Sequence, residues 1–564
     1  MTKNSTGAVE IGQTPGIIAT CQFNSLNCYD SKKVAMFMNR PASRITIALC
    51  IFNASLCSSA GDWPQWGGTN NRNMVSQEKG LPESFEPDKD KAAEHKARNV
   101  KWVARLGAHA YGNPTVADGR VFVGTNAQGL SSDPRFDFTK GGLLMCLDEA
   151  AGEVLWQLAV PERRKLPPGA HFGQQYLGLC SSPTVDGDRV YIVTSAADVL
   201  SLDVNGQANG NDGPFKDEGQ YMAGTDKAPV ELTGKDGDII WRFDPIDELG
   251  VIPHDAASCA ALIVGDMLYI GTSNGVDESH NKVLAPQAPS LIVLDKRTGR
   301  LVATEDEKIG TRLWHAQWAS PSSGKVGGGT LIFFAGGDGI CYAFEAISAA
   351  AEKPVHLKKV WSYDCNPPEY RLRDGKEIPY YDGDKRKSNS PNKNDGSYLG
   401  PSQIIATPVF HEGRVYVAIG QDPAHGRGRG LLHCIDASKT GDITRTGCVW
   451  TYNGLDRSIA TTAVADGLVY LVDIAGRLHC IDAKTGERCW VHETNDETWG
   501  GPLVADGKLY FGNKRDFYIM AAGREPKLLS TIRMSAPVYS TPVAANGVLY
   551  IASNRYLWAA QVTQ

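Results

Sequence analysis

Short apolar runs separated by turn residues make up most of this chain, and the stretch Leu468–Trp490 displays the pattern most clearly. Three apolar runs follow one another there, interrupted by Ala475-Gly476 and by Ala483-Lys484-Thr485-Gly486. Apolar runs of this length bounded by glycine turns are typical of antiparallel β-strands. Copies of the pattern recur from Pro114 to Ala560, which indicates a repeat fold rather than a single site.

A turn residue followed by a branched residue and an aromatic residue marks each repeat. The eight copies are Gly119–Phe122, Asp188–Tyr191, Asp266–Tyr269, Thr330–Phe333, Gly413–Tyr416, Gly467–Tyr470, Gly507–Tyr510 and Gly547–Tyr550. The last two intervals between the aromatic residues are both 40 residues long, which matches a four-stranded propeller blade of about 40–45 residues. We therefore predict an all-β fold, an eight-bladed β-propeller of four-stranded antiparallel blades over residues 100–564.

The ends of the predicted strands repeat as well. Counting strands A to D outward, strand C is expected to end at Asp148, Asp203, Asp295, Glu345, Asp436 or Asp482. Strand D is expected to end at Trp156, Trp241, Trp361, Trp450 or Trp490. The last repeat stops near Gln561 without a fourth strand, whereas Lys101-Trp102 at the front has the form of a strand D. We expect this N-terminal strand to complete the eighth blade, because closure removes exposed sheet edges.

The segment from Ile481 to Trp490, Ile-Asp-Ala-Lys-Thr-Gly-Glu-Arg-Cys-Trp, resembles the tryptophan-docking repeat of PQQ-type quinoprotein propellers. The resemblance covers about residues 100–561. The runs Trp63–Gly68 and Trp314–Pro321 are most similar to secreted, uncharacterised bacterial members of that family. The family includes pyrroloquinoline-quinone dehydrogenases and an outer-membrane assembly scaffold, so the resemblance implies the fold and leaves the activity open.

Charge and hydropathy limit the partners and the cellular location that we expect for this chain. The net charge is -6 and no basic stripe is present, which disfavours nucleic acid as a partner. No apolar run reaches the roughly 20 residues of a membrane-spanning helix. The run Ile45–Leu56 follows Arg40 and Arg44 and precedes the small residues Ser58-Ser59-Ala60, which is the form of a secretory signal.

These features predict the domain organisation and the location. Residues 1–37 are expected to be a gene-model extension or a disordered tail, and residues 38–60 a signal peptide that begins at Met38. Residues 61–99 are expected to be an N-terminal loop segment before the propeller. The predicted location is the periplasm or the cell exterior, with no transmembrane span after signal cleavage.

The 13 cysteines carry no CxxC or CxxCH motif, so zinc-ribbon, thioredoxin-like and attached-haem sites lack support. The hairpin between Cys480 and Cys489 would bring these two residues close together. A disulfide there is conceivable in an exported protein. Small buried thiols are the favoured interpretation.

Insertions relative to the 40-residue repeat fall mostly on one side of the predicted ring. Four-stranded blades place their B–C loops and D–A connections on the same face. The insertions on that face are residues 126–140, 160–179, 275–289, 364–403 and 420–430, whereas only residues 206–237 are inserted on the opposite face. Because binding residues tend to lie on loops held by a rigid scaffold, we expect any site on the B–C and D–A face.

The candidate residues on that face carry two kinds of chemistry. His254, Asp255 and His315 are the candidate catalytic residues, since imidazole and carboxylate groups act as bases or metal ligands. The candidate cofactor-binding residues are Trp318, Gln317, Trp499, Arg457, Asp422 and His425. Trp318, Trp499 and Tyr539 would offer flat rings on which a cofactor or a sugar stacks. The identity of any bound metal stays open.

The quinoprotein resemblance implies a cofactor that this sequence supports only in part. Related dehydrogenases hold pyrroloquinoline quinone with an adjacent Cys-Cys disulfide, a calcium ion bound by Glu and Asn, and a catalytic Asp. No adjacent cysteine pair occurs in this chain. Pyrroloquinoline quinone with calcium and the absence of any cofactor are therefore equally compatible with the sequence.

Three functional hypotheses follow. The first is an exported binding or assembly scaffold that acts through its B–C and D–A loops. The second is a PQQ-dependent oxidoreductase acting on an alcohol or a sugar. The third is a glycan-binding or carbohydrate-active protein. The expected partner is accordingly a protein, a glycan or a small molecule.

Overall fold

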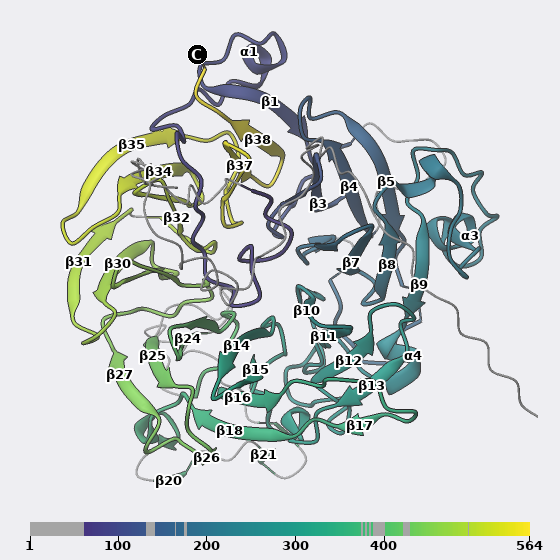
Figure 1. The fold of residues 1–564 in the computed structure, drawn as a ribbon. Helices are drawn as coiled ribbons and strands as arrows, with labels where there is room; N and C mark the ends of the chain where they lie inside the picture. Colours follow the sequence, from purple (N-terminus) through teal and green to yellow (C-terminus); the bar gives the residue numbers. More distant parts are fainter. Residues whose placement is uncertain are drawn as a thin grey trace, which may run out of the picture. The chain divides into compact units, whose positions relative to one another are not determined.

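A closed ring of eight β-sheets forms the body of the protein in the computed structural model (Figure 1). The structure describes residues 61–130, 141–163, 165–173, 177–373, 376–377, 381–382, 385–386, 401–420, 429–494 and 496–563. The expectations for residues 1–60, and those for Asp422 and His425, lie outside these residues. No described helix is both long enough and apolar enough to cross a membrane.

Eight antiparallel sheets of four successive strands confirm the predicted propeller. Blades 1 and 2 comprise β2 (Thr115–Ala117), β3 (Arg120–Asn126), β4 (Gly142–Asp148) and β5 (Val154–Val160), then β6 (Thr184–Asp186), β7 (Arg189–Val193), β8 (Val199–Asp203) and β9 (Ile239–Phe243). Blades 3 and 4 comprise β10 (Leu262–Val264), β11 (Met267–Gly271), β12 (Leu291–Asp295) and β13 (Leu301–Thr304), then β14 (Ser322–Val326), β15 (Gly329–Ala335), β16 (Ile340–Glu345) and β18 (Lys359–Asp364). Blades 5 and 6 comprise β23 (Val409–His411), β24 (Arg414–Ile419), β25 (Leu431–Asp436) and β27 (Cys448–Tyr452), then β28 (Ala463–Ala465), β29 (Leu468–Val472), β30 (Arg477–Asp482) and β31 (Arg488–Glu493). Blades 7 and 8 comprise β32 (Leu503–Ala505), β33 (Lys508–Gly512), β34 (Asp516–Ala521) and β35 (Lys527–Arg533), then β36 (Val543–Ala545), β37 (Val548–Ala552), β38 (Tyr556–Ala560) and β1 (Val100–Arg105).

The remaining elements are short and lie in the connections. The helices are α1 (Lys89–Ala93), α3 (Glu218–Ala223) and α4 (Pro245–Leu249), with 3₁₀ turns η1 (Gly206–Asn209), η2 (Ile309–Arg312) and η3 (Pro368–Tyr370). Two-residue strands β17 (Val355–His356) and β26 (Gly441–Asp442) add parallel edges to blades 3 and 4. Two small hairpins consist of β19 (Leu372–Arg373) with β20 (Lys376–Glu377), and β21 (Tyr381–Asp382) with β22 (Lys385–Arg386). Helix α1 therefore interrupts the segment before Val100 that was expected to be loop throughout.

Strand β1 closes the ring by pairing antiparallel with β38, and Val103 lies opposite Trp558. This register confirms that the Lys101-Trp102 strand completes the eighth blade. The predicted strand C ends are also correct, since Asp148, Asp203, Asp295, Glu345, Asp436 and Asp482 are each the last residue of their strand. The predicted strand D ends are wrong, because each strand continues for at least two residues beyond its tryptophan.

Tryptophans of strand D dock each blade onto the next. The indole Nε1–H donates to a backbone carbonyl in the C–D turn of the following blade at six of the eight interfaces: Trp102 to Glu149, Trp156 to Val204, Trp241 to Lys296, Trp361 to Ala437, Trp450 to Ala483 and Trp490 to Gly523. Gly486 shows why the turn is built with glycine. Its φ is +76°, and a Cβ there would lie 2.7 Å from the Trp450 ring.

The N-terminal segment crosses the middle of the ring (Figure 1) and hydrogen-bonds to the innermost strand of every blade. The contacts run in order from Trp63 with Val116 and Pro64 with Val185, through Asn70 with Ile263 and Ser323, Asn71 with Phe410 and Asn73 with Val464, to Met74 with Val504 and Ser76 with Ala544. Because the inner edge of each strand A has no other sheet neighbour, this inner segment, residues 63–76, supplies the missing partners.

Arg72 fixes the centre of the inner segment. Its guanidinium is fully buried and donates to the carbonyl oxygens of Ala261 at 2.8 Å and Pro321 at 3.0 Å, from the connections that precede blades 3 and 4. Burial lowers the pKa of Arg72 to about 10. The side chain therefore stays charged at neutral pH, and its hydrogen bonds to carbonyl dipoles offset its desolvation.

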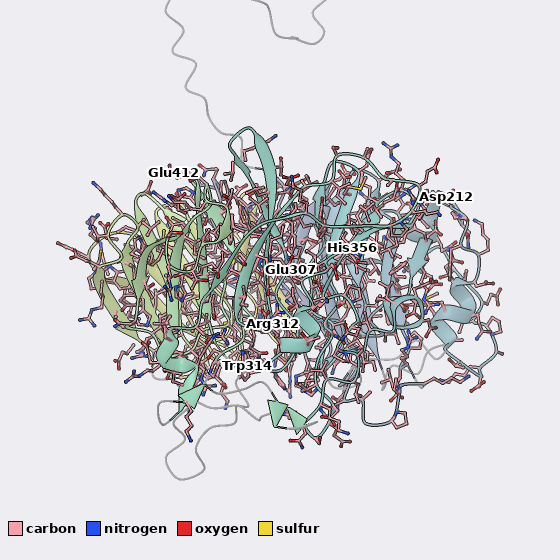
Figure 2. All side chains as sticks on the ribbon, turned by 90° about the horizontal axis from the view of Figure 1, so that it is seen from below. Asp212, Glu307, Arg312, Trp314, His356 and Glu412 are labelled. Atoms are coloured by element: carbon pink, nitrogen blue, oxygen red, sulfur yellow. The ribbon has the colours of Figure 1, made fainter. Side chains whose placement is uncertain are left out.

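The two faces of the ring differ. We call the face formed by the B–C and D–A connections the loop face, and the face formed by the A–B and C–D turns the turn face. Glu412, in an A–B turn, and Asp212, in the C–D insertion of blade 2, lie toward one side in Figure 2, whereas Trp314, in a D–A connection, lies toward the other. Just beyond the inner segment the chain reaches an A–B turn, since Glu78 accepts from the backbone of Asn546 and Gly547.

Candidate functional site

Four connections of the loop face bring a group of histidines together at blade 3. His254 lies in the D–A connection that precedes the blade, and His280 in its B–C loop. His315 lies in the D–A connection that follows the blade, and His171 in the connection between blades 1 and 2. The ring centroid of His254 lies 4.5 Å from that of His315, 4.9 Å from that of His280 and 5.2 Å from that of His171.

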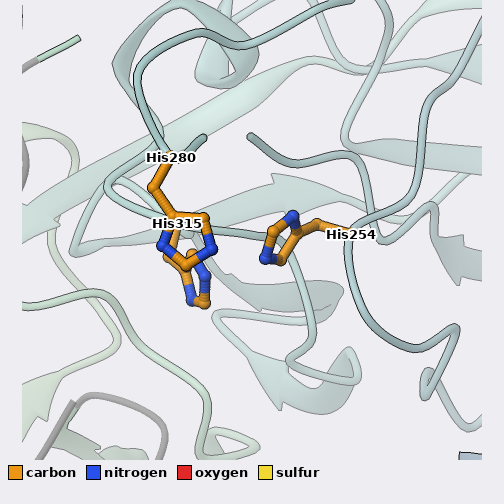
Figure 3. A group of neighbouring side chains, drawn as sticks. All are labelled: His254, His280 and His315. Carbon is orange, nitrogen blue, oxygen red and sulfur yellow. The ribbon is translucent and has the colours of Figure 1, made fainter. Parts of the chain in front are cut away.

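His254, His280 and His315 form the core of this group, which we call the histidine centre (Figure 3). One ring nitrogen of each lies within 4.8 Å of the corresponding nitrogens of the other two. His254 and His315 are buried, whereas His280 is half-buried. The centre therefore has two fixed rings and one that borders solvent.

The tautomer of His254 is set by its surroundings. Its Nδ1 lies 2.7 Å from the Val276 carbonyl oxygen, which can only accept, so Nδ1 carries the proton. Nε2 is then a lone-pair acceptor, and it is buried without a hydrogen bond among the described residues. Leaving a buried acceptor unsatisfied costs about 1–3 kcal/mol, so this atom is available for a ligand.

Burial and the neighbouring imidazoles keep His254 neutral. Desolvation, followed by the proximity of His315 and His280, lowers the pKa of His254 to about 2. The side chain therefore presents an uncharged lone pair at every pH near neutrality.

Asp255 places a carboxylate beside the histidine centre. Its Oδ1 lies 3.0 Å from His171 Nε2, and its Oδ2 lies 3.6 Å from His254 Nε2. The backbone is anchored on both sides, because Asp255 N donates to His171 O and Gly173 N donates to Asp255 O. Asp255 is thus a carboxylate shared between two imidazoles at the edge of the centre.

Two residues of this region have left-handed backbones although they are not glycine. The φ angles are +55° at Asp255 and +58° at His280. Such conformations cost on the order of 1–3 kcal/mol each and persist only where the surrounding structure imposes them. Asp and His adopt this conformation more readily than most residue types, and both residues lie in connections that hold the histidine centre.

Gly275 lets the connections approach each other. A Cβ at this position would lie 2.5 Å from the Cβ of His254 and 2.9 Å from the Cβ of Ala316. The backbone of Gly275 bridges to Ala316, and Val276 N donates to His315 O at 2.9 Å. The same two residues of the B–C loop therefore hold both buried histidines.

Trp318 closes one side of the centre. Its ring lies edge-on to His315 at a centroid distance of 5.0 Å, and its Nε1–H donates to the His254 carbonyl oxygen at 3.1 Å. The sequence singled out this residue for stacking on a cofactor. The structure instead gives its polar atom a partner within the protein, while its half-buried ring borders the histidines.

Gln317 and Asp338 are buried within connections of the loop face, and their side chains bond to other parts of the protein. Gln317 Nε2 donates to Ala335 O at 2.6 Å, and its Oε1 accepts from Gly337 N at 2.7 Å. The buried Asp338 carboxylate accepts from Tyr342 at 2.6 Å and pairs with Arg312 at 3.1 Å. Burial raises the pKa of Asp338, against the opposing effect of Arg312. Both residues support the connection that carries His315.

The other predicted residues lie apart from the histidine centre. Trp499 belongs to an aromatic stack, with centroids 4.2 Å from Tyr539 and 5.7 Å from Tyr111, contributed by the D–A connections on both sides of blades 7 and 8. The Trp499 and Tyr539 rings are nearly parallel at 15° and overlap at this distance, whereas the Tyr111 ring is parallel within 16° but offset. Arg457 is fully buried in the connection before blade 6.

The structure thus brings His254, Asp255, His315 and Trp318 together and separates them from Trp499 and Arg457. The sequence did not single out His280. A histidine within the B–C insertion at residues 275–289 was the available signal, but no spacing rule ties that loop to residues 254 and 315. All nine described cysteines are free, including Cys480, which is buried, and Cys489, which is half-buried.

Comparison with known proteins assigns the repeat. The family model described as outer membrane protein assembly factor BamB matches residues 102–305, 297–498 and 429–525. A stretch of 121 residues is 32% identical to the quinohemoprotein alcohol dehydrogenase ADH IIB of Pseudomonas putida, and a stretch of 122 residues is 30% identical to ADH-IIG of the same organism. Each stretch covers 20% of this chain and 16% of the relative, so the matches span about a sixth of these curated relatives.

Solved structures with similar folds come from both groups. BamB from Moraxella catarrhalis has a TM-score of 0.45 and 14% identity, covering 82% of this chain and 97% of that one. Quinohemoprotein alcohol dehydrogenase from Comamonas testosteroni has a TM-score of 0.43 and 13% identity, covering 88% of this chain and 80% of that one.

Proposed function

The chain belongs to the family of the outer membrane protein assembly factor BamB, and from this premise we propose that it is an exported binding scaffold whose binding surface is the loop face. One observation carries the proposal. The inner segment uses the inner edges of all eight blades and the chain just beyond it reaches an A–B turn, whereas the long B–C and D–A insertions are on the opposite side.

The loop face carries most of the long connections, whereas the turn face carries the C–D insertion of blade 2 at residues 206–237. The connections of the loop face carry the histidine centre and the aromatic stack. The eight A–B turns are tight hairpins of about two residues, and two of them bind the chain that follows the inner segment, through Glu78 and Leu81. Variable loops on a rigid scaffold are the usual place for recognition.

A quinoprotein oxidoreductase is the second candidate, and the similarity to quinohemoprotein alcohol dehydrogenases favours it. The described residues do not fit the quinone and calcium. Calcium takes six to eight oxygen ligands, whereas the one group of three or more His, Cys, Asp or Glu side chains that the described residues bring together as a metal site consists of imidazoles. The described cysteines form no disulfide, adjacent or otherwise. We therefore derive no catalytic step through the quinone.

Photo-crosslinking in the source cells tests the binding face. Crosslinking residues would replace the exposed Lys282 and Arg429 on the loop face, with the exposed Glu412 and Asp466 of A–B turns as matched controls. We expect both loop-face positions to capture the same partner and the controls to capture none. Equal capture from both faces, or capture from the turn face alone, would contradict the proposal.

Reconstitution separates the scaffold from the quinoprotein. Purified protein incubated with pyrroloquinoline quinone and calcium is expected to give neither a bound quinone spectrum nor alcohol-dependent dye reduction. Either signal would overturn the pure scaffold function.

Export has its own test. The predicted signal peptide ends at Ala60, so the exported protein is expected to begin at Gly61. N-terminal sequencing of the protein from the periplasmic or extracellular fraction measures this directly. A protein retained in the cytoplasm with residues 38–60 intact would contradict export.

A further inference from the structure

We infer that the histidine centre is a binding site for one divalent first-row transition metal ion, with zinc as the best fit. His254, His280 and His315 each supply one nitrogen, and the site leaves a position open toward Asp255 and solvent. This inference is independent of the proposed scaffold function.

The geometry suits an ion of this class. Zinc–nitrogen bonds of about 2.0–2.1 Å place the nitrogens of one tetrahedral site roughly 3.4 Å apart. The three nitrogens already lie within 4.8 Å of one another, and they come from three separate connections. His280 is half-buried in a loop and is the ring that has room to complete the closure.

The surroundings have the features of a second coordination shell. The Val276 carbonyl accepts from His254 Nδ1, which orients the ring and directs Nε2 to the centre. A metal-bound histidine usually gives its second nitrogen to such a carbonyl or carboxylate. Val276 N also donates to the His315 carbonyl, so a single residue positions both buried ligands.

The alternative is that three histidines pack together without an ion. In that arrangement the buried Nε2 of His254 keeps no hydrogen bond among the described residues, although Asp255 Oδ2 lies 3.6 Å away. A carboxylate cannot donate to this lone pair at neutral pH, because it is an acceptor only. A cation satisfies the lone pair and also draws the Asp255 carboxylate toward the same point.

The donor set selects the metal. Neutral imidazoles bind zinc, copper and nickel, whereas calcium and magnesium prefer oxygen ligands. Three protein ligands with a fourth open position are the arrangement of catalytic zinc sites. Asp255 is placed to bind in the fourth position or to hydrogen-bond a water there.

Zinc titration of the purified propeller, stripped with a chelator, tests the site. We expect one zinc ion per chain by calorimetry and no comparable binding of calcium. His280→Ala is expected to weaken zinc binding by at least roughly tenfold, and its position on a half-buried loop keeps the fold intact. His356→Ala, which removes an exposed histidine in β17, is the matched control and is expected to change nothing.

Cobalt substitution gives a second measurement, and it is made first on the intact protein, without any substitution at the buried His254 or His315. Cobalt bound by the intact protein is expected to show the strong visible bands of a four-coordinate site, and His280→Ala to weaken them. The inference is overturned if zinc binds with the same affinity to the wild type and to His280→Ala. It is also overturned if His356→Ala loses as much binding as His280→Ala, because surface histidines would then account for the ion.

Discussion

The indole Nε1–H of Trp318 donates to the backbone carbonyl of His254 over 3.1 Å. This bond joins the connection after blade 3 to the connection before it, across the histidine centre. Because Trp318 and His315 are on the same connection, the bond also fixes the distance between the two buried histidines.

Trp318→Phe is expected to weaken zinc binding by roughly tenfold, because it keeps an aromatic ring and removes the bond that holds the His254 backbone. The loss of unfolding free energy is expected to be about 1 kcal/mol. Calorimetric zinc titration and urea denaturation measure the two effects. Trp490→Phe, which loses an equivalent bond to Gly523 at 2.9 Å, is the control. If Trp490→Phe weakens zinc binding as much as Trp318→Phe, the effect of Trp318 does not come from its bond to His254.

Gly486→Ala is expected to destabilise the docking of blade 5 onto blade 6. Gly486 and Gly467 have nearly the same positive φ, +76° and +72°, but a methyl group at Gly486 would lie 2.7 Å from the Trp450 ring, whereas one at Gly467 would meet open space. Gly467→Ala is expected to cost about 1–2 kcal/mol for the backbone alone. Gly486→Ala is expected to cost about 1–3 kcal/mol more, from the collision with the indole. Equal losses in denaturant unfolding would show that the docking contact contributes nothing.

Asn73→Ala tests the inner segment. The Asn73 amide donates to Val464 O and accepts from Val464 N, both at 2.8 Å, so the substitution leaves two backbone groups of blade 6 without partners. We expect a loss of about 2–4 kcal/mol in unfolding free energy and faster proteolytic release of residues 61–80. Thr69→Ala removes an exposed hydrogen bond to Asn71 in the same segment and serves as the control. A similar loss of unfolding free energy from both variants would mean that the Asn73 contact with Val464 has no special part in stabilising the fold.

His433 is expected to make the stability of blade 5 pH-dependent. Burial lowers the pKa of His433 to about 4, whereas an unfolded histidine titrates near 6.5. Between these values the unfolded chain binds a proton that the folded protein does not. The contribution of His433 to the free energy of unfolding therefore falls by about 3 kcal/mol as the pH drops from about 6.5 to about 4.

Denaturant unfolding of wild type and His433→Gln across this pH range measures the effect. We expect the variant to have a flatter profile, because glutamine does not titrate. His411→Gln, which alters a half-buried histidine elsewhere in blade 5, is the matched control. An unchanged slope in His433→Gln would assign the pH dependence to other groups.

Much of the fold was predictable because it depends on local chemistry repeated eight times. The Asp or Glu at the end of strand C and the Gly in the following turn are set by backbone conformation within a few residues, and the sequence displays both. The predicted strand D boundary at the tryptophans is wrong, because those strands extend by pairing with strand C rather than by any local signal.

The inner segment shows where local sequence patterns stop being informative. Residues 61–76 contain many Gly and Asn residues and have no periodicity, which predicts irregular chain. That description is correct, yet it does not reveal that Asn70, Asn71 and Asn73 bond to blades 3 to 6. The sequence does not show which distant backbone group an asparagine side chain or carbonyl will bond to.

For the candidate site, too, some features were predictable from the sequence and others were not. The sequence by itself determined the propeller, its closure by β1 and the face on which the insertions lie, since these follow from strand periodicity and loop length. Only the tertiary structure decided that His280 joins His254 and His315 and that Trp499 lies in a separate aromatic stack. It also decided that the Gln317 amide hydrogen-bonds to the backbone of the protein. The physical reason is that a propeller fixes the direction of each loop through its blade, while the meeting of side chains depends on contacts such as Gly275 against His254, which join residues from different connections.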